Sequence, residues 1–156
     1  ITRRMKIKKS ELQIIDFNLL GVNIISFPEN ENANNETRNK FDIDFDVFIN
    51  TDNDRQFKIM IRLNNFKDEG PQSGYGIDVT GEFKFKFDKK SDISEDKKSQ
   101  LVSRSAIPMA IAHLRSIIAL TTSNFYDGSY FLPSIDLNHL LQRKLKSIDV
   151  KTSLEE

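Results

Sequence analysis

Hydrophobic and polar residues alternate through the first half of the chain. The alternation is clearest in "GEFKFKF" at 81–87, where Phe83, Phe85 and Phe87 are separated by charged residues. Because successive side chains of a strand point to opposite faces, this pattern predicts a strand with one aromatic and one charged face. Burial of each Phe side chain is worth about 1.5–3 kcal/mol, so another element must cover the aromatic face.

Four segments of this kind predict an antiparallel sheet. We expect strands at 12–27, 40–50, 55–66 and 77–87, separated by polar links or by links that contain Gly and Pro. Links of this type between successive strands favour antiparallel pairing. Gly21 lies inside the first segment and predicts a bulge or a bend there.

Helical signals replace the alternation after residue 88. We expect a short helix at about 94–104, a long helix at 107–123 that Pro108 opens, and a last helix capped by Asp136. The sequence therefore predicts an α+β fold of two layers. A four-stranded antiparallel sheet is followed by a long helix and a short C-terminal helix.

The long helix is apolar on two sides. One stripe is suited to cover the aromatic face of the sheet: Ile107, Ile111, Leu114 and Ile118. The opposite side has no formal charge at five positions, which we predict to contact a second copy: Met109, Ala112, His113, Ser116 and Leu120. In the alternative, the 94–104 segment covers this side and the core is simply longer.

Composition narrows the class of protein. The chain has 156 residues, of which 38% are hydrophobic, and its 23 basic residues equal its 23 acidic residues. We expect one domain at 11–146, with a basic tail at 1–10 and a polar tail at 147–156. The charge balance gives no argument for nucleic acid or an anionic membrane, and no apolar run reaches the length of a membrane span. With no cysteine and no signal-peptide pattern, a cytoplasmic protein is expected.

The chemistry of an active site is not evident in the sequence. His113 and His139 are the only histidines, and neither has a second metal ligand at a suitable spacing. Asp42, Asp44 and Asp46 alternate along a strand and lack the Gly and Glu of a calcium loop. Neither a phosphate-binding loop nor a nucleophile elbow is present. We therefore expect no enzyme activity, no cofactor and no metal site.

The order and spacing of these elements resemble the protein-export chaperone SecB family. The resemblance rests on "FDIDFDVFIN", "RQFKIMIRLNNF" and "YGIDVTGEF", followed by "IPMAIAHLRSIIALTTSNFYDGSYFLPSIDLNHLL". It covers roughly residues 11–145, and no single motif in it is specific. The family has an alternating apolar and Asp strand, a Gly-x-Phe in the fourth strand, a Pro-opened long helix and a Leu-x-Pro before the last helix.

The resemblance implies a function. SecB proteins assemble as dimers of dimers, so it implies a homotetramer. They hold unfolded polypeptides or preproteins in hydrophobic grooves without ATP, and they take part in protein export. Six residues would form the client-binding groove: Phe41, Ile43, Phe45, Leu137, Leu141 and Leu145. From the residues alone, a strand stripe and a helix stripe of this kind favour an ordinary core; with the resemblance, core and groove are equally favoured.

One departure from the family bears on the partner. Export-type SecB is acidic and docks the SecA motor through acidic residues on its sheet, whereas this chain is formally neutral. Holding of unfolded clients is therefore better supported than SecA docking, and a chaperone dedicated to another partner, such as an antitoxin, remains open. The sequence is also compatible with a small-molecule or acyl-binding protein that has a helix on a sheet, and with an assembly subunit that binds no client.

Overall fold

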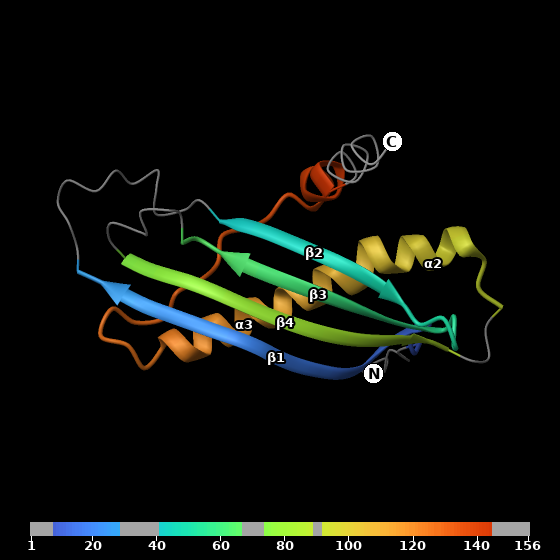
Figure 1. The fold of residues 1–156 in the computed structure, drawn as a ribbon, viewed down its shortest axis with the longest axis horizontal. Coiled ribbons are helices and arrows are strands. Elements are labelled where there is room, and N and C mark those ends of the chain that lie inside the picture. The colour runs from blue at the N-terminus through green and yellow to red at the C-terminus, as the bar shows by residue number, and fades with distance from the viewer. Residues whose placement is uncertain (1–7, 29–40, 67–73, 89–91, 145–156) are drawn as a thin grey trace, which may run out of the picture.

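A four-stranded antiparallel sheet forms one layer of the fold and a long helix forms the other (Figure 1). The fold is taken from a computed structural model, which describes residues 8–28, 41–66, 74–88 and 92–144. The strands lie in the order β1-β4-β3-β2, with these bounds: β1 Leu12–Phe27, β2 Asp42–Ile49, β3 Gln56–Asn64 and β4 Gly74–Phe87. The predicted α+β class and the four strands are confirmed.

The aromatic face of β4 lies against the helix. Phe83 and Phe85 are fully buried, and Phe87 is almost so. All four residues of the predicted helical stripe, from Ile107 to Ile118, are buried in the same core. The aromatic face of the strand, with a period of two, and the apolar stripe of the helix, with a period of 3.6, therefore bury each other.

The other face of the sheet is charged, as the alternation predicts. Lys58 on β3 forms an ion pair with Glu82 on β4 at 3.0 Å, and Lys84 on β4 pairs with Asp16 on β1 at 3.3 Å. This surface is called the outer face below. The surface that contacts the helix is called the inner face.

The edge strand β1 contains two irregularities. Its register against β4 shifts between Ile14 and Asp16, and again between Leu19 and Gly21. The second shift confirms the bulge predicted at Gly21. Each bulge adds one residue to β1, which keeps apolar residues on the inner face along a strand of 16 residues.

The predicted pair of helices at 94–104 and 107–123 is one continuous helix, so the break at Pro108 is wrong. It runs through α2 (Glu95–Leu101), a π-helical turn η1 (Val102–Ala106) and α3 (Ile107–Thr122). The backbone N–H of Ile107 donates to the carbonyl of Val102, five residues earlier. A proline inside a regular helix clashes with the carbonyl four residues before it, and this wider turn accommodates Pro108.

The continuous helix also removes the longer-core alternative raised by the sequence. Because α2 extends the axis of α3, the 94–104 segment does not fold back over the outward side of the long helix (Figure 1). Its own start agrees with a helix near 94, since the Ser94 side chain accepts a hydrogen bond from the N–H of Lys97 at 3.4 Å.

The chain then returns to the sheet edge, where a last helix begins. Arg115 on α3 donates to the carbonyl of Leu132 at 2.8 Å, which holds the connection beside the long helix. The N–H of His139 donates to the Asp136 carboxylate at 3.1 Å, which confirms the predicted cap. The described part of this helix, residues 137–144, lies next to β2 (Figure 1). Residues 1–7 of the predicted basic tail and the predicted polar tail at 147–156 lie outside the described residues.

Candidate functional site

The long helix covers the two central strands and leaves the inner face of both edge strands partly open. On β3, Ile59 and Ile61 are fully buried. On the neighbouring strand β2, exposure increases along the inner face: Phe45 is 6% exposed, Val47 is 38% exposed and Ile49 is 71% exposed. Exposed apolar side chains in a row on one strand mark a surface that another molecule can cover.

A groove of about 640 Å³ follows this open part of β2. Its floor is formed by apolar residues from the sheet, the helix and the last helix: Phe45, Val47, Ile49, Phe57, Phe87, Val102, Ile107 and Leu141. The groove is bounded on one side by β2 and on the other by α2 and η1. It is therefore an apolar channel beside an edge strand.

Lys144 connects the last helix to β2 at one end of the groove. Its ammonium lies 2.7 Å from the Asp44 carboxylate and 2.9 Å from the Asp46 carboxylate, and it sits 5.6 Å from the centre of the Phe45 ring. Burial opposes the charge of Lys144, but the hydrogen bonds to Asp44 and Asp46 outweigh it and raise the pKa of the ammonium. The contact holds the last helix over Phe45, which is 6% exposed.

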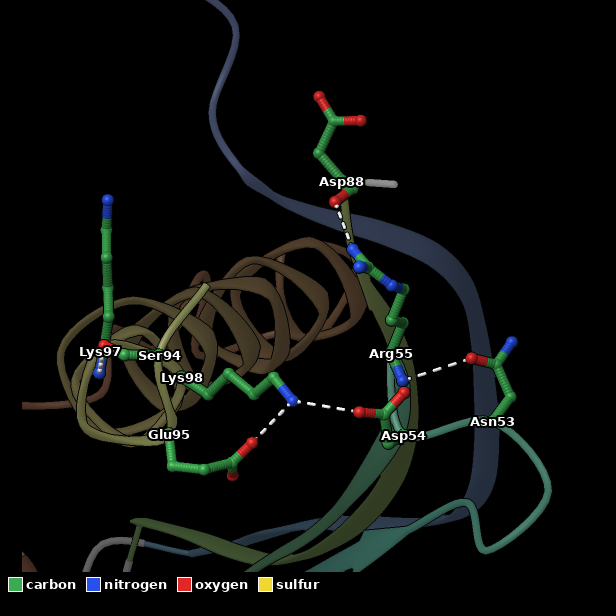
Figure 2. Close-up of polar contacts among 8 residues, drawn as sticks. All are labelled: Asn53, Asp54, Arg55, Asp88, Ser94, Glu95, Lys97 and Lys98. Carbon is green, nitrogen blue, oxygen red and sulfur yellow. Dashed lines mark hydrogen bonds and ion pairs between the residues drawn. The ribbon is translucent and has the colours of Figure 1, made fainter. Parts of the chain in front are cut away.

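Lys98 makes a similar contact at the other end (Figure 2). Its ammonium lies 2.7 Å from Glu95 on its own helix and 3.1 Å from Asp54 in the β2–β3 turn. The hydrogen bond to Glu95, and then that to Asp54, raise the pKa of Lys98. The contact therefore links α2 to the turn that follows β2, across the groove.

The turn itself is held by side chains that Figure 2 also shows. Asn53 accepts a hydrogen bond from the N–H of Arg55 at 3.1 Å, and the Arg55 guanidinium donates to the carbonyl of Asp88 at 2.9 Å. These bonds fix the β2–β3 turn to the end of β4, so Asp54 projects toward α2 from a defined position.

The structure brings together only part of the predicted groove. Phe45 and Leu141 both line it. Ile43 lines a separate hollow of about 390 Å³ between β2 and the last helix. The Phe41 ring packs at a tilt against the Tyr130 ring, with 5.9 Å between the ring centres, and Leu137 packs partly against the core. Leu145 lies outside the described residues.

Sequence reasoning missed six apolar residues of the groove, of which Phe57 and Phe87 belong to the buried face of the sheet. Val47 and Ile49 continue the same alternation as Phe45, so the pattern contained the signal for both. Val102 and Ile107 join the groove because α2, η1 and α3 form one helix. The expected break before Pro108 concealed that continuity.

The five residues predicted to contact a second copy are all exposed. Met109 is 43% exposed and Leu120 is 69% exposed, and Ala112, His113 and Ser116 lie between them on the same side of α3. The His113 ring also packs 4.5 Å from the Phe17 ring and 5.6 Å from the Phe83 ring.

The helix 95–122 is long and apolar enough to cross a membrane, judged by length and composition alone. The core helices of soluble proteins share this property, so it is weak evidence for a membrane span.

The described residues contain no cluster of three His, Cys, Asp or Glu side chains that is close enough to hold a metal ion. The aromatic neighbours of His113 give it a packing role, and the backbone of His139 serves the helix cap. The chemistry that the geometry does support is the burial of apolar side chains in the groove.

Comparison with known proteins establishes the class of fold. No model of a known protein family matches the sequence, and no curated protein does. Among solved structures, the Mycobacterium tuberculosis Rv1957 SecB-like chaperone, in complex with a ChAD peptide from the Rv1956 HigA1 antitoxin, matches with a TM-score of 0.53. The two sequences are 14% identical, and the match covers 80% of this chain and 91% of that chain.

A protein of unknown function from Streptococcus agalactiae also matches, with a TM-score of 0.49 and 10% identity. That match covers 80% of this chain and 98% of the other. At such low identity the first comparison supports a SecB-like fold, which is the arrangement that the sequence analysis expected.

Proposed function

We propose that this protein is a chaperone that holds unfolded polypeptide segments in the groove beside β2 without ATP. The observation that carries the proposal is the open apolar channel in which Val47 and Ile49 remain exposed on an edge strand. The SecB-like fold supports the proposal, because a chaperone with a similar fold is known in complex with a peptide of an antitoxin.

The mechanism follows from the position of the groove. An extended client buries apolar side chains against Val47, Ile49 and Val102, and each well-buried side chain contributes about 1.5–3 kcal/mol. β2 is an edge strand of the sheet, so the backbone edge that faces away from β3 can pair with the client main chain. Main-chain pairing and shallow apolar contacts recognise many sequences, as an unfolded-protein chaperone requires.

The charges around the groove set a preference among clients. The charged groups that line it are the carboxylates of Asp54 and Glu95 and the ammonium groups of Lys98 and Lys144, which balance. The lining therefore attracts neither strongly acidic nor strongly basic segments. The preferred client is an apolar segment without a strong net charge.

The outer face supports a dedicated client more than docking to SecA. Asp78 is held by Arg62 through two hydrogen bonds of 2.9 and 2.6 Å, which lower the pKa of the Asp78 carboxyl, and Glu82 and Asp16 pair with lysines. Acidic groups that are neutralised within the sheet are poor attachment points for a basic motor. An antitoxin peptide is therefore a better candidate than a preprotein on its way to SecA.

Self-association is part of the same proposal. The exposed side of α3, from Met109 to Leu120, is apolar and uncharged, and a second copy would bury it. Several copies of a shallow groove on one assembly raise the affinity for a long client by about 10²–10⁴ over one groove. Leu120→Glu is expected to reduce the mass measured by light scattering, and a monomeric parent protein would contradict this part of the proposal.

Aggregation of a chemically unfolded protein tests the function. The wild-type protein should suppress aggregation near stoichiometric amounts without nucleotide, and the double variant Val47→Ser/Ile49→Ser should lose most of the suppression. Both positions are exposed, so the variant is expected to fold. Tyr126→Ser, which removes a fully exposed aromatic from the loop after α3, is the matched control.

An acyl-binding protein predicts the opposite results. In that case the protein would fail to suppress aggregation even in excess, and an acyl ligand would bind tightly in the same channel. Equal suppression by the wild type and the double variant would place the client elsewhere and would contradict the groove proposed here.

A further inference from the structure

A second apolar surface lies on the outer face of the sheet, opposite the groove. A hollow of about 400 Å³ is lined there by Ile15, Phe48, Ile49, Lys58 and Lys84, together with Asn50, Gln56, Phe57 and Phe85. Ile15 and Phe48 are 44% and 43% exposed. Among the described residues, no carboxylate lines the hollow.

The strand register explains how the hollow is built. Phe48 on β2 lies opposite Lys58 on β3, and Lys58 lies opposite Lys84 on β4. The Lys58 ammonium sits 5.4 Å from the centre of the Phe48 ring. On β1, the bulge between Ile14 and Asp16 places Ile15 at the same row. One row across the whole sheet thus combines two apolar side chains with two ammonium groups and the carboxylate of Asp16, which lies opposite Lys84.

Charge is distributed unevenly along the outer face. The row of Phe48 and the row beyond it, toward the β2–β3 turn, contain three lysines, Lys58, Lys84 and Lys86, and one carboxylate, Asp16. The three rows on the other side contain one cation, Arg62, and five carboxylates: Asp42, Asp44, Asp46, Asp78 and Glu82. The end of the sheet that holds the hollow is therefore cationic.

Lys58 and Lys84 face each other directly across two strands. Like charges in that position repel, and each lysine is paired with one carboxylate: Lys58 with Glu82 at 3.0 Å, and Lys84 with Asp16, its cross-strand partner on β1, at 3.3 Å. An anionic group that enters the hollow between the two lysines relieves the repulsion further. The arrangement thus favours a negatively charged occupant over a neutral one.

We propose that this outer hollow docks an acidic peptide segment of a partner protein, with one apolar side chain of the segment inserted between Phe48 and Ile15. Carboxylates on either side of that anchor approach Lys84 and Lys86. The site goes beyond the proposed function, because it lies on the other face of the sheet and takes a different class of peptide.

Two labelled peptides of about ten residues test the proposal. Both contain Phe-Leu at the centre, one with Glu on both sides and one with Lys, and binding is followed by fluorescence anisotropy at low salt. The Glu peptide should bind the wild-type protein, and Lys84→Glu/Lys86→Glu should weaken it about tenfold. Arg104→Glu changes a single charge on the helix side of the sheet, and there the affinity should stay unchanged.

Phe48→Ser provides a second variant that leaves the charges intact. It should weaken the Glu peptide and leave aggregation suppression by the groove unchanged, whereas Val47→Ser, which changes the groove but not the hollow, should impair suppression. If Phe48→Ser does not weaken the Glu peptide, the proposal for the outer hollow fails. If the groove variant does not impair suppression, the proposal for the groove fails.

Three results would overturn the inference. The Glu and Lys peptides could bind equally, with no effect of Lys84→Glu/Lys86→Glu. The Glu peptide could be lost in Leu141→Ser but not in Phe48→Ser, which would place it in the groove. Phe48→Ser could instead lower the mass of the assembly in light scattering, which would identify a second copy of this chain as the occupant.

Discussion

The two faces of β2 differ in what surrounds equally exposed apolar residues. Val47 and Phe48 are neighbours in sequence and are 38% and 43% exposed, yet Val47 lies in the groove and Phe48 in the outer hollow. Two carboxylates and two ammonium groups balance in the lining of the groove, whereas lysines alone supply the charge among the described residues that line the hollow. Exposure alone does not distinguish the two surfaces, and the charge pattern set by strand register does.

The largest expected effect separates the inner face from the outer face of β4. Phe83→Ala should lower the free energy of unfolding by about 3–5 kcal/mol, because the ring is fully buried against the helix. Lys84→Ala, at the next residue, should change it by less than about 0.5 kcal/mol. Urea unfolding of the two variants measures the difference, and similar losses would mean that β4 is buried on both faces.

A smaller effect tests how tightly the sheet is covered near the start of β4. A Cβ at Gly76 would lie 2.6 Å from the Phe66 ring and 2.8 Å from the Phe27 ring, so Gly76→Ala should cost about 1–3 kcal/mol of unfolding free energy. A Cβ at Gly21 would meet nothing within 4 Å. Gly21→Ala should therefore be nearly neutral in the same urea experiment. A neutral Gly76→Ala would show that the two rings do not cover this part of the sheet.

The smallest effect concerns the contact that holds the last helix to β2. Lys144→Met should lower stability by no more than about 1 kcal/mol, and hydrogen exchange at residues 137–144 should become faster. Because the folded state raises the pKa of Lys144, this stabilisation is present below its ordinary value of 10.5 and is lost as pH rises through the raised pKa.

Urea unfolding from about pH 9 to about pH 12 should therefore bring the wild-type protein and Lys144→Met together at the alkaline end. Arg104→Met, which removes a cation from the exposed side of the long helix, is the control. A difference that persists unchanged to the alkaline end would assign the effect to packing of the side chain rather than to its charge.

Local periodicity explains how much of the fold could be predicted. The alternation of Phe83, Phe85 and Phe87 and the stripe from Ile107 to Ile118 each require burial, so both elements follow from sequence alone. The continuity of the helix does not, because Pro108 is an ordinary helix-start signal and the π-helical turn before it leaves no pattern.

The candidate sites depend on contacts between distant segments. Leu141 reaches the groove through the contact of Lys144 with Asp44 and Asp46, about 100 residues away along the chain. The outer hollow depends on the bulge that places Ile15 beside Lys84. Neither contact follows from composition or periodicity, which explains why sequence reasoning did not find Phe48 or Ile15.

A fluorescent label on β2 tests the central claim most directly. The chain contains no cysteine, so Val47→Cys and Phe48→Cys each offer one attachment point for a bimane label. Addition of a chemically unfolded, non-acidic polypeptide should shift the emission of the label at 47 and leave the label at 48 unchanged. A shift at 48 alone, or no shift at either position while aggregation is still suppressed, would contradict the groove as the place where this protein holds its clients.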